Sequence, residues 1–136
     1  MSTLATTNLK NPSASGNNIV LAATGRVTVT SASATIVTLT DGATITPDFD
    51  AGCNFAVTLG GNRSIANPSN IAAGQSGSIF ISQDGTGSRT ASFGSYWDFP
   101  AGTAPTLTTT ASAVDRIDYV VRTTTSIQAV FTANYL

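Results

Sequence analysis

The last 22 residues, DRIDYVVRTTTSIQAVFTANYL (115–136), decide the fold class because their polarity alternates with a period of two. The first run places Ile117, Tyr119 and Val121 on one side and three charged residues on the other. The second run does the same with Ile127, Ala129, Phe131, Ala133 and Tyr135. Successive side chains of a strand point to opposite faces, so these runs and the threonines between them predict a β-hairpin. One face of this hairpin is expected to pack on a core, and the other to face solvent or a partner.

Shorter runs upstream show the same alternation and end at turn residues such as Asp41-Gly42. These runs cover residues 18–25, 26–33, 35–42, 54–62, 77–85 and 88–94. The run at 77–85 differs in being apolar on both faces, at Ile79, Phe80 and Ile81, which predicts cover on both sides. No segment has a clear period of 3.6, and charged residues make up only 10%, with no glutamate and one lysine, so a solvated helix face is hard to build. Short strands at this spacing predict an all-β fold: an antiparallel β-sandwich or small β-barrel with a C-terminal hairpin and an extended N-terminal arm.

The length of 136 residues predicts one domain. We assign residues 19–136 to a single all-β domain and residues 1–18 to the arm, which is polar and interrupted by Pro12 and Gly16. Such an arm is usually disordered in a monomer. It could be ordered by lying along a neighbouring subunit. The arm residues expected to grip a shell or a subunit are Leu4, Leu9, Lys10 and Pro12.

Charge and cysteine content argue against several classes of protein. The formal net charge is −1 and the arginines are scattered, so neither nucleic acid nor an anionic membrane is an expected partner. No apolar run approaches the roughly 20 residues of a membrane span, and no signal peptide is visible at the start. A net charge near zero favours association into an oligomer or larger assembly. Cys53 is the only cysteine and is expected to be a small buried hydrophobic residue.

The run Asp84-Gly85-Thr86-Gly87 resembles a phosphate or metal loop. A phosphate loop would need a helix after its glycines, whereas a Ser/Thr-rich strand is expected here. A calcium loop would need several oxygen ligands, and Asp84 stands alone. We therefore predict a hairpin turn at this run, and we expect neither a cofactor nor a metal.

The residues of the usual catalytic sites are scarce in this chain. It has no histidine, so none of its serines or threonines has the usual base to activate it. Asp48 and Asp50 could serve a glycosidase if they lay across a cleft, but their spacing around Phe49 is more typical of a solvated turn. Enzymatic activity is not expected, and a small glycosidase using Asp48 or Asp50 is the least favoured alternative.

Four aromatic residues gather within residues 93–99: Phe93, Tyr96, Trp97 and Phe99. The favoured interpretation is that their rings cap one end of the core under a long loop. The alternative is a contact surface for a partner or a receptor, because Trp and Tyr are enriched at interfaces. The alternation of the sequence does not decide which rings face outward.

Two stretches together resemble virion proteins of tailed bacteriophages. LKNPSASGNNIVLAATGRVTV (9–29) is similar to the short segment that precedes domains of phage tail-fibre and related structural proteins. AGCNFAVTLGGNRSIANPSN (51–70) and residues 74–121 are similar to a module at the ends of fibre proteins and in small stand-alone virion proteins. The strings LGGNR, QDGTGSRT and AVDRIDYVV are distinctive in combination, and the resemblance covers most of the chain.

The resemblance implies a homotrimeric structural or adhesive protein without enzymatic activity, made in the host cytoplasm and located on the virion. The chain has room for one small domain and an arm, which favours a capsid cement (decoration) protein over a tail fibre. Its partners would then be copies of itself and the major capsid protein or other virion proteins. The alternative is a receptor-binding module of a tail fibre or tailspike, which would bind a host surface glycan.

Overall fold

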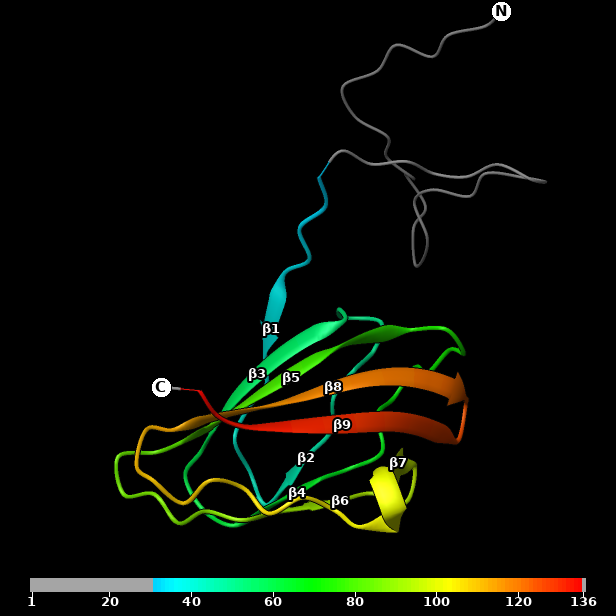
Figure 1. The fold of residues 1–136 in the computed structure, drawn as a ribbon. Helices are drawn as coiled ribbons and strands as arrows, with labels where there is room; N and C mark the ends of the chain where they lie inside the picture. Colours follow the sequence, from blue (N-terminus) through cyan, green and yellow to red (C-terminus); the bar gives the residue numbers. More distant parts are fainter. Residues whose placement is uncertain (1–30, 136) are drawn as a thin grey trace, which may run out of the picture. The chain divides into compact units, whose positions relative to one another are not determined.

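The structure, a computed structural model, describes residues 31–135, and β-strands are its main elements (Figure 1). The strands are β1 (Ile36–Thr38), β2 (Thr44–Ile45), β3 (Asn54–Leu59), β4 (Arg63–Ile65), β5 (Ser76–Gln83), β6 (Ala91–Phe93), β7 (Trp97–Asp98), β8 (Val114–Thr123) and β9 (Ser126–Tyr135). A short 3₁₀ helix, η1 (Pro100–Gly102), follows β7. The predicted all-β class is confirmed for this part of the chain. The predicted arm at 1–18 and the strands expected before residue 31 lie outside the described residues.

Strands β1 to β6 alternate between two sheets, so the chain winds through three successive coils (Figure 1). One sheet has the order β1-β3-β5-β8-β9-β7, and the other has the order β2-β4-β6. The coils are in parallel register: Val37 pairs with Phe55, and Phe55 pairs with Ile79. The second sheet has an equivalent column made of Ile45, Ile65 and Phe93. Each coil therefore contributes one residue to each column.

The expected antiparallel arrangement is correct only for β8, which pairs with β5 and with β9 in that direction. The neighbouring strands of the coils are parallel, and so are β7 and β9. The hairpin predicted at residues 84–87 is wrong, because β5 and β6 belong to different sheets. Alternation reports which side chains share a face, and this signal is the same whether the chain folds back or turns a corner into another sheet.

The predicted C-terminal hairpin is confirmed by the pairing of β8 with β9. Its inward pairs are Ile117–Phe131, Tyr119–Ala129 and Val121–Ile127. Two residues expected to face inward, Ala133 and Tyr135, are exposed instead. The pairing shifts register between Val114 and Arg116, and Asn134 has a φ of 60°, so the end of β9 departs from regular alternation.

The core contains buried residues from both sheets and from the loops beside them. Its largest fully buried apolar side chains are Phe55, Leu59, Ile65, Ile79, Ile81, Ile117, Ile127 and Val121. Gly77 of β5 lies where the coils meet the hairpin, because it pairs with Tyr119 of β8. The backbone approaches it closely, since a Cβ there would lie 1.7 Å from the Cys53 carbonyl oxygen. The Tyr119 hydroxyl donates a 2.8 Å hydrogen bond to the same oxygen. Burial raises the pKa of Tyr119, so its phenol stays protonated and keeps donating.

Candidate functional site

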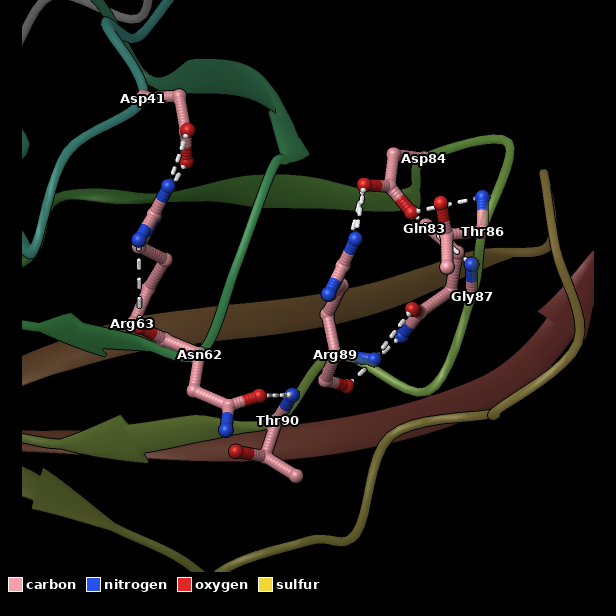
Figure 2. A network of polar contacts seen from close by, with 9 residues as sticks. All are labelled: Asp41, Asn62, Arg63, Gln83, Asp84, Thr86, Gly87, Arg89 and Thr90. Carbon is pink, nitrogen blue, oxygen red and sulfur yellow. Dashed lines mark hydrogen bonds and ion pairs between the residues drawn. The ribbon is translucent and has the colours of Figure 1, made fainter.

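The run Asp84–Gly87 begins the corner that leads from β5 toward β6, shown in Figure 2. Oδ1 of Asp84 accepts the backbone N–H groups of Thr86 and Gly87 at 3.0 and 2.9 Å. Oδ2 accepts Nε and Nη2 of Arg89 at 3.0 and 2.7 Å. The Arg89 guanidinium lowers the pKa of Asp84 to about 2, with help from the two backbone donors. Both carboxylate oxygens therefore accept hydrogen bonds from within the corner and stabilise it.

Side chains at the corners link successive coils (Figure 2). The first corner joins β1 to β2, the second joins β3 to β4 and the third joins β5 to β6. Arg63 at the second corner makes two hydrogen bonds with Asp41 of the first, at 2.7 and 2.8 Å, and these bonds lower the pKa of Asp41. Asn62 Oδ1 accepts the Thr90 N–H of the third coil at 3.1 Å. Within the third corner, buried Gln83 donates to the Arg89 carbonyl and accepts the Arg89 N–H. These contacts show that the side chains of Asp41, Asn62, Arg63 and Gln83 act as structural links.

The acids Asp48 and Asp50 lie in an exposed turn. Oδ1 of Asp48 accepts the Asp50 N–H at 3.0 Å and Nδ2 of Asn70 at 2.7 Å, which lowers the pKa of Asp48. The hydrogen bond from Asp48 to the Asp50 backbone is typical of a turn-forming aspartate. In the part of the chain that the structure describes, no group of three or more His, Cys, Asp or Glu residues could hold a metal ion.

Two of the four predicted contact aromatics belong to the core. Trp97 and Phe99 are 6% and 8% exposed, and Nε1 of Trp97 donates to the Ala66 carbonyl at 3.0 Å. Phe93 is half-buried and packs edge-on against both of these rings, and Tyr96 is also half-buried. A surface role for Trp97 and Phe99 does not fit this burial. Phe93 and Tyr96 remain partly exposed.

An exposed apolar surface lies instead on the outward side of the hairpin. We call it the valine face and define it by Asp118, Val120, Arg122, Gln128 and Val130. Val120 and Val130 are 53% and 57% exposed, and the register places Val120 opposite Gln128 and Asp118 opposite Val130. The two valines are therefore diagonal neighbours on one side of the sheet. A groove of about 490 Å³ runs over this surface toward Phe99 and Pro100.

The valine face carries a charge of each sign. Asp118 forms a 2.9 Å ion pair with Arg116 and accepts the Ser78 hydroxyl at 2.6 Å. Arg122 lies at the exposed end of β8 and has no ion-pair partner among residues 31–135. The sequence pattern had placed positions 116, 118 and 122 outward, and Val120 has the same parity. A valine at an outward position was the available signal for this surface, and the sequence reasoning missed it.

A second hollow lies beside the first coil. It measures about 470 Å³, and Val37, Leu39 and Ile45 contribute its apolar lining. β1 and β2 are the edge strands of their sheets as the described residues show them. This end of the coils therefore combines strand edges with partly covered apolar side chains.

Comparisons with known proteins identify no relative: no family model, no curated protein and no solved structure matches the chain. Among the described residues, no helix is long and apolar enough to cross a membrane.

Proposed function

We propose that this chain is a non-enzymatic structural protein of a tailed-bacteriophage particle, specifically a capsid cement (decoration) protein that acts as a homotrimer on the outer surface of the head shell. The resemblance of the sequence to phage virion proteins is the source of this proposal. The structural observation that supports the proposal is the exposure of Val120 and Val130 on the surface of a small protein with few charges. Paired exposed valines favour a protein that works by contact with other chains.

In this proposal the two sheets form a sandwich that serves as the body of each subunit. Residues 1–18 are the arm that reaches the shell or a neighbour, with Leu4, Leu9, Lys10 and Pro12 as the gripping residues. The partners are further copies of the chain and the major capsid protein. The few charges of the chain suit contacts based on apolar burial and hydroxyl hydrogen bonds.

The copy number of the chain in purified parent particles tests this function. A cement protein is expected at hundreds of copies per particle, with density on the head shell in cryo-electron microscopy. A handful of copies confined to the tail would overturn the cement proposal. Deleting residues 1–18 is expected to leave a folded domain that no longer binds the particle, with the full chain as the control.

A receptor-binding module is the second candidate, and the ring of Tyr135 favours it. This ring is 41% exposed, and the Arg116 guanidinium lies 5.1 Å from its centroid. Exposed aromatic rings commonly stack on sugars, so this ring replaces buried Trp97 as the residue to test. A glycan array with the intact protein is expected to give hits that Tyr135→Ala abolishes. An array without any hit would remove this candidate.

A further inference from the structure

We infer that the valine face is a contact surface between two copies of this chain, related by a twofold axis. The inference deepens the proposed self-association, and it does not depend on where the protein lies in a virion. It begins from the outward residues of β8, where Asp118, Val120 and Arg122 follow one another at alternate positions. An apolar residue is thus flanked by one negative and one positive side chain on the same face.

This order of charges is complementary to itself. When two sheets pack face to face about a twofold axis that crosses β8 at Val120, the strand of the partner runs in the opposite direction. Val120 then meets the partner's Val120, and Asp118 meets the partner's Arg122. Each contact therefore buries two exposed valines between two new ion pairs. A partner with a strong net charge of either sign gains no comparable match on this face.

The surroundings of these residues permit the contact. Arg122 has no ion-pair partner within residues 31–135, so pairing across the axis breaks no described salt bridge. The Asp118 side chain is 42% exposed while it pairs with Arg116, so its carboxylate can accept a second guanidinium. Val130 and Gln128 extend the apolar and uncharged surface beside Val120. The groove next to them leaves room for side chains of the second copy.

A charge-exchange experiment on the full chain tests the pairing. The mass of wild type, Arg122→Asp and Asp118→Arg is measured by analytical ultracentrifugation over a range of concentrations. Each variant alone places like charges opposite each other twice, so its dissociation constant is expected to rise by about tenfold or more. An equimolar mixture of the two variants restores both opposite-charge pairs. We therefore expect mixed pairs in the mixture at concentrations at which neither variant alone pairs through this face.

Two further variants distinguish loss of this contact from loss of folding. Val120→Thr keeps a β-branched residue at an exposed position, and is expected to weaken association while the circular dichroism and thermal midpoint stay unchanged. Thr58→Asp, on the outward side of β3, is the matched control and is expected to leave association unchanged. A twofold contact gives even assemblies, a dimer alone or a hexamer when it joins two trimers.

Three outcomes would overturn the inference. A wild-type monomer at all concentrations would remove the contact and the homotrimer, while the copy number in particles would still test the virion location. A trimer whose mass is unchanged in all variants would place the copy contact elsewhere and leave the homotrimer standing. Loss of binding to particles in Val120→Thr, with self-association unchanged, would assign the face to a shell protein.

Discussion

The coil stack (β1–β6) and the C-terminal hairpin (β8–β9) are both built from alternating strands, yet different contacts hold them together. In the hairpin, Val121 pairs with Ile127 across a short turn, and a backbone ladder with a register shift near each end joins the strands. In the stack, Phe55 pairs with Ile79, a full coil later in the chain. Closing such a long loop costs somewhat more chain entropy than closing a hairpin, and contacts between coils offset this cost.

The corners of the stack supply some of these contacts through polar side chains. Arg63 joins the first two corners, Asn62 joins the second and third, and Asp84 orders the third. Among the described residues the turn of the hairpin is simpler, with hydroxyl contacts between Thr123 and Thr125. The comparison indicates that changes at corners should act on the stack, and that changes on buried pairs should act on the hairpin.

Gly77→Ala is expected to have the largest effect because it acts where the stack and the hairpin meet. The new Cβ would lie 1.7 Å from the Cys53 carbonyl oxygen and 3.0 Å from the Tyr119 hydroxyl, so a backbone segment must shift. We expect a loss of about 4 kcal/mol or more in the free energy of unfolding, measured by urea denaturation. Gly85→Ala is the control, since a Cβ there meets nothing within 4 Å. Equal stabilities of the two variants would contradict the close approach.

Asp115→Ala, at the open end of the hairpin, is expected to have the second-largest effect on the free energy of unfolding. The side chain is 1% exposed, and its oxygens accept the N–H groups of Thr108 and Asn134 at 2.8 and 2.9 Å. Removing it leaves two amides without an acceptor, at a cost of about 2 to 3 kcal/mol in the free energy of unfolding. Hydrogen exchange should show faster exchange at these two amides.

The control for this change is Asp98→Ala, which removes an exposed carboxylate that accepts only the Ser126 hydroxyl among the described partners. Its cost is expected to stay below about 1 kcal/mol. A loss for Asp115→Ala as small as that for Asp98→Ala would show that the loop and the end of β9 do not depend on the buried carboxylate.

The same comparison explains which parts of the fold could be predicted from sequence. Alternation identified the inward residues Ile117, Tyr119 and Val121, and a short turn left β8 and β9 only one way to pair. For the stack, alternation identified the inward residues Phe55, Val57 and Leu59 but carried no information on which strand lies beside them. Parallel neighbours a full coil apart leave no local turn signal, so the antiparallel prediction was wrong there.

The candidate site shows a similar division. The sequence indicated that Asp84 belongs to a turn, because no helix follows the glycines and no second acid supports it. It could not orient the rings at 93–99, because Trp97 and Phe99 owe their burial to contacts with distant residues such as Ala66. Lys10 and the rest of the arm lie outside the described residues, so their gripping role stays a prediction.

Asp84→Asn is expected to have the smallest effect, and its effect depends on pH. The pKa of Asp84 is about 2 in the folded chain and 3.8 for the ordinary group, so folding favours the ionised form. This carboxylate therefore contributes stability that is fully present above pH 3.8 and is lost as the pH falls toward 2. In urea denaturation at several pH values, Asp84→Asn should be less stable than wild type at pH 7, and the difference should shrink toward pH 2.

Arg89→Gln is the matched variant for this prediction because it removes the cation of the same pair. It should also lower stability at pH 7 and flatten the acid dependence, since the guanidinium is the main cause of the lowered pKa. Neither change touches β8 or β9, so hydrogen exchange in the hairpin should keep its order of protection in both variants. An undiminished acid dependence in Asp84→Asn would assign it to other carboxylates, first to Asp41, whose pKa the Arg63 guanidinium also lowers. That result would identify the contact between the first two coils, and not the third corner of the stack, as the acid-sensitive link.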